Sequence, residues 1–155
     1  MKVNISEEKA WQKIKSYCAY QERCHREVKE KLYCLGLYKP QVEILLSRLI
    51  EENFLNEERF ATAYAGGKFR VKQWGRVKIR YQLKQKGVSE FCIRKGLLSI
   101  ERDDYYHTLK KLFENKQREI KESDLYKKKK TIQTYLMQKG YEMDEIRKMI
   151  NEKPL

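Results

Sequence analysis

One segment of nine residues decides the fold, because it occurs three times: VKEKLYCLG at 28–36, IRYQLKQKG at 79–87 and IQTYLMQKG at 132–140. Each copy has an aliphatic residue, a Leu four positions later, and a Gly after four more. The copies are almost evenly spaced along the chain, about fifty residues apart. Such a period indicates stacked copies of one supersecondary unit, each too small to bury its own apolar face.

The repeated segment divides the chain into three repeats, which we place at residues 1–53, 54–100 and 101–155. Each repeat has apolar residues at helical spacing, a Gly that can end a helix, and a further amphipathic stretch. Only two prolines and seven glycines are present, which leaves little room for β-turns and long loops. The sequence therefore predicts an all-α protein of three tandem three-helix, helix-turn-helix-like repeats in an elongated, curved array.

Individual residues predict where helices begin and which faces are buried. Ser6, Asn56 and Ser89 are expected N-caps. The charged segment 114–130 is expected to lengthen a helix or to form a mobile connection, because Lys127–Lys130 would be unfavourable at a positive helix start. The buried side of the first helix of the second repeat is predicted to consist of Phe60, Ala63, Tyr64 and Phe69.

The charge of the chain favours a polyanionic partner. The chain has 35 basic and 22 acidic residues, a net charge of +13. Residues 68–95 contain ten of the basic residues and one acid, Glu90, so the positive charge is concentrated in the middle repeat. Nucleic acid, an acidic membrane, or a protein coated on nucleic acid would suit this charge. A surface that is merely soluble is the alternative.

The sequence gives little support for catalysis. It has no Gly-rich phosphate loop and neither an HExxH nor a GxSxG motif. His25 and His107 are the only histidines, and neither has a nucleophile nearby in the sequence. Asp103 and Asp104 are adjacent, so their side chains diverge on a helix. We predict that the protein is not an enzyme and uses no cofactor.

The cysteines and the hydropathy pattern limit the possible disulfides, metal sites and membrane contacts. Four cysteines, Cys18, Cys24, Cys34 and Cys92, show no CxxC pairing and are interpreted as buried small apolar residues, without a disulfide framework or a metal site. No stretch has the length of a membrane span, and the first twenty residues lack the apolar block of a signal peptide. We expect a cytoplasmic monomer that does not contact a membrane.

The helix expected at 76–86 carries a row of three cations, Arg76, Arg80 and Lys84. This basic row lies beside the buried stripe of Ile79 and Leu83. Like charges at this spacing repel by a few tenths of a kcal/mol per pair, so folding gains nothing from them. The equivalent positions hold His25, Lys29 and Tyr33 in the first repeat and Lys129, Gln133 and Met137 in the third. Binding of an anionic surface is the favoured interpretation, and an ordinary solvated helix face is the alternative.

Arg70, Lys72 and Trp74 precede this helix and add a cationic, aromatic edge. Arg and Trp are enriched at the energetic centres of protein interfaces, and aromatic rings also stack on exposed bases. The sequence leaves both uses open, together with simple packing of Trp74 against a neighbouring repeat.

The middle repeat also carries a recognisable pattern. The segment FLNEERFA at 54–61 is followed by Gly75, Ile79 and Leu83, and then by KGVS at 86–89. This pattern resembles the signature of the bacterial RecX regulators, an L-D-D-x-R-[FY]-A opening followed by G-x-x-x-[IL]-x-x-x-L-x-x-K-G-[IV]. Asn56 and Glu57 replace the usual acidic pair, which leaves the cap intact. The repeat period and the total length extend the resemblance, more loosely, over almost the whole chain.

The resemblance to RecX implies a non-enzymatic regulator that binds RecA and the RecA–single-stranded DNA filament. It implies inhibition of recombinase, ATPase and coprotease activity in DNA repair and the SOS response. The implied partners are the RecA filament and single-stranded DNA, contacted directly or through RecA. From the charge pattern we assign seven residues to this contact: Arg76, Arg80 and Lys84, supported by Arg70, Lys72, Trp74 and Lys78.

Two other functions stay open. A sequence-specific helix-turn-helix protein would use 89–98 as its recognition helix, which offers Glu90, Arg94 and Lys95 but few Asn or Gln residues for base edges. A general RNA or single-strand chaperone would share the charge and act without RecA.

Overall fold

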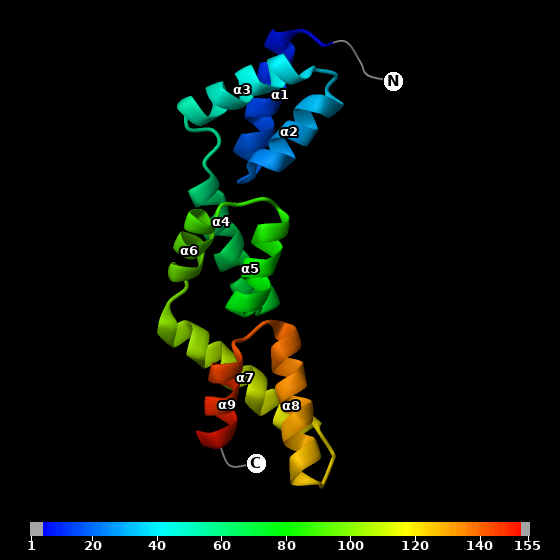
Figure 1. The fold of residues 1–155 in the computed structure, drawn as a ribbon, viewed down its shortest axis with the longest axis vertical. Coiled ribbons are helices and arrows are strands. Elements are labelled where there is room, and N and C mark those ends of the chain that lie inside the picture. The colour runs from blue at the N-terminus through cyan, green and yellow to red at the C-terminus, as the bar shows by residue number, and fades with distance from the viewer. Residues whose placement is uncertain (1–4, 153–155) are drawn as a thin grey trace. The chain divides into compact units, whose positions relative to one another are not determined.

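The computed structural model describes residues 5–152, and over this range the chain is all-helical, without a β-strand. The first helices are α1 (Glu7–Tyr20), α2 (His25–Cys34) and α3 (Lys39–Glu51); they are followed by α4 (Glu57–Gly67), the single π-helical turn η1 (Lys68–Lys72), α5 (Arg76–Gln85), α6 (Glu90–Leu98), α7 (Arg102–Glu119), α8 (Leu125–Lys139) and α9 (Met143–Glu152) (Figure 1). The predicted all-α, three-helix-repeat fold is confirmed. The chain-end residues 1–4 and 153–155 of the predicted repeats lie outside the described range.

The Gly that closes each copy of the repeated segment has the left-handed conformation that ends a helix. The φ angles are 95° at Gly36, 79° at Gly87 and 98° at Gly140. Residues with a Cβ rarely adopt such angles, so Gly is the residue that best suits this position.

The chain forms two compact units. The first unit comprises the chain up to Ala63 together with Leu83–Lys95, and the second comprises Tyr64–Gln82 together with the chain from Gly96 onward. The second repeat therefore contributes residues to both units. The repeat boundaries at 53/54 and 100/101 and the curved array stay predictions.

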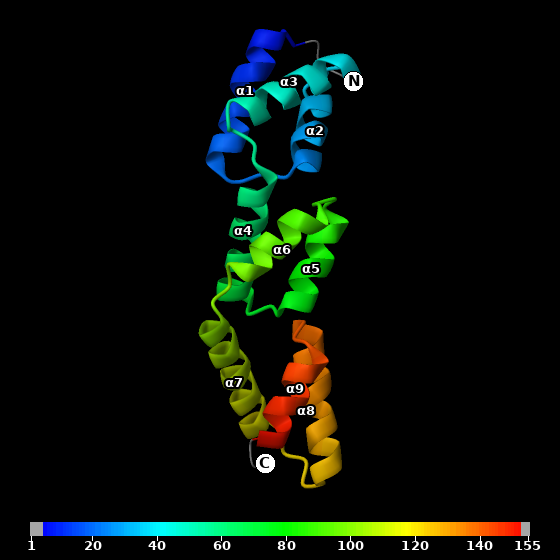
Figure 2. The same cartoon turned by 60° about the vertical axis from the view of Figure 1, so that its left-hand side comes forward.

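The first unit has an apolar core enclosed by α1, α2 and α3, which contact one another (Figure 2). Its buried residues are Ala10, Trp11, Ile14, Cys18, Val28, Leu32, Leu37, Val42, Leu45, Leu46, Leu49 and Leu55. Burying one such aliphatic side chain contributes about 1.5–3 kcal/mol to folding. Within each helix the core residues recur at helical spacing and so share one face.

Two side chains of α4 hold the start of the second repeat within the first unit. Glu57 pairs with His25 Nδ1 at 3.1 Å, and its other oxygen accepts the Ser89 N–H at 3.1 Å. Arg59 pairs with Glu22 and donates to the Asn53 carbonyl at 3.1 Å. Both residues belong to the FLNEERFA segment, so that part of the signature has a structural role.

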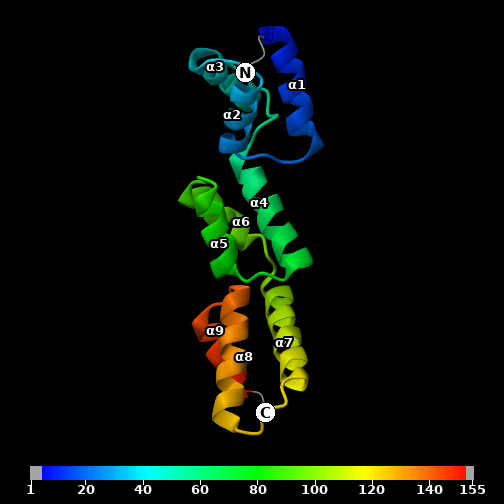
Figure 3. The same cartoon turned by 90° about the vertical axis from the view of Figure 1, so that its right-hand side faces the viewer.

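The second unit is built around α7, α8 and α9, with α7 beside α8 and α9 packed on α8 (Figure 3). Its buried side chains include Ala65, Phe69, Ile79, Leu97, Ile100, Tyr105, Leu109, Leu112, Phe113, Ile132, Leu136, Tyr141, Ile146, Met149 and Ile150. Phe69 and Tyr105 have ring centroids 5.8 Å apart, and Tyr105 and Tyr141 are 5.1 Å apart. This aromatic group joins the turn before α5 to the third repeat.

The beginning of α5 meets the end of α8 through backbone hydrogen bonds within the second unit. The Gly75 N–H donates to the Lys139 carbonyl at 2.8 Å, and the Val77 N–H donates to the Gly140 carbonyl at 2.9 Å. The first N–H groups of a helix and its last carbonyls lack partners inside the helix, so these bonds satisfy both ends. A Cβ on Gly75 would overlap the backbone of Gly140.

The predicted N-caps are confirmed. Ser6 accepts the Lys9 N–H at 3.2 Å, Asn56 accepts the Arg59 N–H at 2.9 Å, and Ser89 accepts the Cys92 N–H at 3.3 Å. Each bond satisfies one of the unpaired N–H groups of a first helical turn.

The predicted apolar face of α4 needs correction. Phe60 and Phe69 are buried as expected, but Ala63 is exposed and Tyr64 is only half-buried. Ala61 and Ala65 are buried instead. Ala63 lies two positions from Ala61, about 200° around the helix, and so faces the opposite side.

The segment 114–130 lengthens two helices, one of its two predicted outcomes. α7 continues to Glu119 and α8 begins at Leu125, so Lys127–Lys130 does lie at a helix start. Asp124 accepts the Lys127 N–H at 3.0 Å, and its negative charge opposes the unfavourable interaction of the lysines with the helix dipole.

All four cysteines are free thiols. The interpretation as buried apolar residues is right for Cys18 and Cys24, whereas Cys34 is exposed and Cys92 is half-buried. Burial raises the pKa of both Cys18 and Cys24 to about 11.

The close approach of α5 and α8 predicts that Gly75→Ala destabilises the chain. The added methyl group must push the two backbones apart and weaken their hydrogen bonds, at a cost of about 2–3 kcal/mol in unfolding free energy. Gly67→Ala is the matched control, because a Cβ at Gly67 meets nothing within 4 Å. In a helix this control should be neutral or stabilising by up to about 1 kcal/mol. Urea denaturation of both variants tests the difference, and equal stability would contradict the packing.

The cysteine environments predict an order of alkylation. Only thiolates react with iodoacetamide, and at pH 8 a thiol with a pKa near 11 is almost fully protonated. Cys34 should therefore be modified first, Cys92 more slowly, and Cys18 and Cys24 only after unfolding. Peptide mass spectrometry of partially alkylated protein measures this order, and early labelling of Cys18 would refute it.

Candidate anion-binding surface

The seven predicted site residues are divided between the two compact units. Lys84 belongs to the first unit, and the other six, Arg70, Lys72, Trp74, Arg76, Lys78 and Arg80, belong to the second.

Trp74 is the centre of a cation–aromatic cluster in the second unit. The Nζ atoms of Lys78 and Lys68 lie 4.8 Å and 5.1 Å from the centroid of its ring. Lys68 also lies 5.5 Å from the Tyr64 ring. Each contact of this kind contributes about 0.5–1 kcal/mol at exposed sites. Two ammonium groups thus lie close to the half-buried indole ring.

Backbone geometry explains how Lys68 reaches Trp74 six positions later. The turn η1 widens the end of α4, and Gln73 follows it in the left-handed conformation, with φ 58°. The Trp74 N–H then donates to the Lys68 carbonyl at 3.3 Å. Sequence reasoning missed Lys68, because a helix of ordinary pitch would not place it beside Trp74.

Arg70 and Lys72 are exposed next to this cluster. The Arg70 guanidinium lies over Gly66, where a Cβ would come within 2.8 Å of Nη1. The Lys72 carbonyl accepts Lys139 Nζ at 3.4 Å, which brings a further ammonium group from α8. We call Lys68, Arg70, Lys72, Trp74 and Lys78 the Trp74 surface.

Arg76 has a different environment, because an internal carboxylate neutralises it. Its Nη1 lies 2.9 Å from Glu142 Oε2, and its guanidinium stacks 3.8 Å from the centroid of the Tyr105 ring. Its backbone N–H donates to the Tyr105 hydroxyl at 2.9 Å. We therefore assign Arg76 to the packing of the second unit and not to an exposed basic row.

The equivalent residue of the first repeat, His25, also faces a carboxylate, that of Glu57 in the first unit. Arg76 and His25 thus occupy equivalent positions, and each contacts an acid that comes later in the chain. The partner of Arg76, Glu142, lies 66 residues away, too far for the helical pattern to indicate it.

Two tyrosines support the turn that carries Trp74. The Tyr105 hydroxyl donates to Glu142, and the Tyr141 hydroxyl donates to the Gln73 carbonyl at 3.0 Å. Burial raises the pKa of both tyrosines well above the ordinary value, and the hydrogen bond to Glu142 raises that of Tyr105 further. Both hydroxyl groups therefore stay protonated as donors over the physiological range.

The remaining site residues lie along α5. Arg80 is half-buried, whereas Lys84 and the neighbouring Tyr81 are exposed. Val77 is also exposed, so α5 presents apolar as well as cationic groups. This mixture suits a protein interface as well as a nucleic-acid contact.

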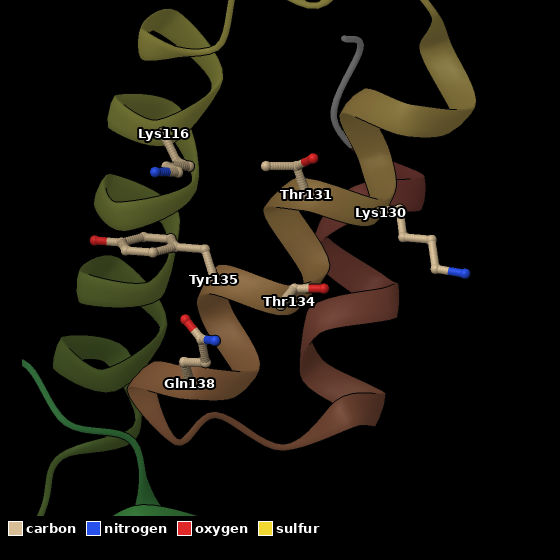
Figure 4. A pocket seen from close by; sticks show the side chains of 6 residues that line it. All are labelled: Lys116, Lys130, Thr131, Thr134, Tyr135 and Gln138. Atoms are coloured by element: carbon tan, nitrogen blue, oxygen red, sulfur yellow. The ribbon is translucent and has the colours of Figure 1, made fainter.

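A separate hollow of about 310 Å³ lies between α7 and α8 (Figure 4). Its lining consists of Lys116, Lys130, Thr131, Thr134, Tyr135 and Gln138. Lys116 Nζ lies 4.7 Å from the Tyr135 ring centroid. The lining contains no carboxylate, thiol or imidazole that would indicate catalysis.

Two further features concern metal and membrane binding. Among residues 5–152, no three His, Cys, Asp or Glu side chains are grouped to hold a metal ion. The same part of the chain has no helix whose length and apolar content would allow it to cross a bilayer.

The fold and the Trp74 surface define a protein of tandem three-helix repeats with a basic, aromatic patch. The model of the second three-helix domain of RecX matches residues 56–97, and that of the third matches residues 103–150. The chain belongs to the RecX family.

Individual relatives agree with this assignment. Regulatory protein RecX of Clostridium perfringens (strain SM101 / Type A) is 36% identical over 124 residues, which is 79% of this chain and 58% of the relative. Regulatory protein RecX of Prosthecochloris aestuarii is 28% identical over 93% of both chains. The crystal structure of RecX from Lactobacillus salivarius has the same fold, with a TM-score of 0.86 at 22% identity over 94% of this chain and 95% of that one. The chain thus spans less than two thirds of the clostridial relative.

The Arg76–Glu142 pair predicts a stability effect that an exposed cation would not show. Arg76→Gln should lower the unfolding free energy by about 1–2 kcal/mol, because the partly buried Glu142 loses its cationic partner and keeps only the Tyr105 hydroxyl. Lys84→Gln removes the same charge from an exposed position of α5 and should change stability by less than about 0.5 kcal/mol. A double-mutant cycle with Glu142→Gln measures the coupling, expected near 1 kcal/mol. Zero coupling would contradict the pairing, and Arg76 would then count as an exposed cation of α5, as the sequence predicts.

Proposed function

We propose that this chain binds RecA and the RecA–single-stranded DNA filament through the Trp74 surface, and thereby inhibits RecA. The affected activities would be recombinase, ATPase and coprotease function in DNA repair and the SOS response. Membership of the RecX family supports the target, since the relatives are named regulatory proteins. The proposed setting is the cytoplasm, with the chain acting as a monomer.

The observation that carries the proposal is the contact of both Lys68 and Lys78 with the half-buried indole of Trp74. Such a cluster keeps two ammonium groups close together, where both can meet acidic atoms of a partner. A RecA–DNA filament offers both protein carboxylates and DNA phosphates. Arg70 and Lys72 add exposed charge beside the ring. Lys84 and Arg80 are proposed as additional anion contacts along α5.

The physical basis for inhibition is occupancy of the filament surface. Cations that neutralise phosphates release counterions, so binding should weaken steeply as salt rises. A chain bound along the filament would obstruct subunit addition and the approach of a second DNA strand. The pairing of Arg76 with Glu142 would fix the orientation of α5 rather than contribute charge to the contact.

The alternative function is that of a helix-turn-helix protein, which would bind duplex DNA sequence-specifically through α6. α6 offers Glu90, Arg94 and Lys95, and few side chains that read base edges. A specific binder should prefer its site over random duplex by at least about 10³-fold. Binding without such preference would reject this alternative.

The test is the DNA-dependent ATPase of RecA in the presence of the chain. Lys72→Glu/Lys78→Glu should weaken inhibition at least about tenfold, because charge reversal repels phosphates and carboxylates within a Debye length. Lys111→Glu/Lys121→Glu is the matched control, since it changes the charge equally at exposed positions of the second unit outside the Trp74 surface. The control should inhibit within about twofold of the unmodified chain.

Two outcomes would contradict the proposal. Equal loss in both variants would assign inhibition to overall charge, and full inhibition by Lys72→Glu/Lys78→Glu would exclude the Trp74 surface. Circular dichroism of each variant establishes that helicity is unchanged.

A further inference from the structure

A second cationic, aromatic hollow lies in the first unit, far along the sequence from the Trp74 surface. It has a volume of about 590 Å³ and is lined by residues of α1, of α2 and its C-cap, and of the connection between the two helices. The lining residues are Gln12, Lys13, Ser16, Tyr17, Tyr20, Arg23, Lys31 and Leu35. We call it the Arg23 groove. Neither the RecX signature segment nor the basic stretch 68–95 contributes to it.

Arg23 is held in place within this groove. Its guanidinium stacks 3.7 Å from the centroid of the Tyr17 ring, and its Nε donates to the Tyr17 carbonyl at 3.1 Å. One hydrogen bond and one stacking contact thus orient the guanidinium plane. A guanidinium fixed in this way can bind a carboxylate through two parallel bonds at little further entropic cost.

The groove is positively charged, and the two glutamates near it, Glu22 and Glu27, bind other groups. Lys13 and Lys31 are exposed and, with Arg23, have no ion pair among residues 5–152. Glu27 accepts the Cys24 N–H at 3.2 Å, and Glu22 pairs with Arg59. No carboxylate lines the groove. Three cations therefore line one hollow, and none of them forms an ion pair with a carboxylate of the described residues.

The aromatic residues distinguish a peptide from a nucleic acid as the occupant. Arg23 already covers the Tyr17 ring at stacking distance, and Lys31 Nζ lies 5.6 Å from the same ring. A base would have to displace these groups in order to stack there. Tyr20 is 83% exposed, and although the Arg23 guanidinium lies 5.9 Å from its ring centroid, most of the ring is accessible to a ligand. Carboxylates next to an apolar side chain match this arrangement better than a phosphate backbone.

We propose that the Arg23 groove docks a short acidic peptide segment of a protein partner. A carboxylate would bind Arg23 and Lys31, a second carboxylate would meet Lys13, and an apolar side chain of the peptide would pack on Tyr20. The proposal is independent of the function assigned to the Trp74 surface, because the two sites share no residue.

The experiment measures fluorescence anisotropy of a fluorescein-labelled peptide of alternating Glu and Ala with one central Phe, added to the full chain. Saturable binding is expected, and the peptide with Gln in place of Glu should not bind. Arg23→Gln/Lys31→Gln should weaken binding at least about tenfold, as expected for loss of a two-pronged charge contact. Lys9→Gln/Lys39→Gln is the matched control, with equal loss of charge at exposed positions of the same unit, and should leave the affinity within about twofold.

A second variant keeps the proposal testable if loss of Arg23 perturbs the connection between α1 and α2. Lys13→Gln/Lys31→Gln retains the Arg23–Tyr17 bond and should still weaken binding several-fold. Unchanged affinity in both variants, or equal loss in the control, would overturn the proposal. A competition with oligothymidylate gives a further outcome that would overturn the proposal. If oligothymidylate displaces the peptide from the unmodified chain but not from the Lys13→Gln/Lys31→Gln variant, the groove is a nucleic-acid site. RecA inhibition is not the readout, so failure of either proposal leaves the other intact.

Discussion

The second unit depends on the backbone contact between the first turn of α5 and the last turn of α8. The N–H groups of Gly75 and Val77 find their acceptors in the carbonyls of Lys139 and Gly140. Since each set of groups would otherwise lack a partner, the contact satisfies two helix ends at once. It also fixes the turn before α5, where Tyr141 binds the Gln73 carbonyl. The position of Trp74 follows from that turn.

A related contact occurs in the first unit. Arg26, in the first turn of α2, donates to the Gln85 carbonyl at the end of α5. A Cβ on Gly87 would come within 2.7 Å of the Arg26 guanidinium. In both units the beginning of the second helix of one repeat thus meets the end of the second helix of the next. The Gly of the repeated segment therefore ends a helix and also leaves space for the preceding repeat.

The sequence predicted the helices, the N-caps and the helix-ending glycines, because these depend on neighbouring residues and on helical spacing. It could not predict Lys68 beside Trp74, since the π-helical turn and the left-handed Gln73 are local departures from that spacing. It also could not identify Glu142 as the partner of Arg76, because that pairing joins residues from different repeats. The charge pattern predicted a basic surface. It could not predict which of the cations are exposed, because contacts with distant segments, such as that of Arg76 with Glu142, decide this.

We expect the α5–α8 contact to exist in solution and to support the Trp74 surface. Hydrogen exchange of single amides, measured by NMR, tests this most directly. The amides of Gly75 and Val77 should be protected to the same degree as core amides of α8, because both donate to carbonyls of that helix end. Exchange of both amides at the rate of exposed amides such as that of Ser123 would show that the contact does not form.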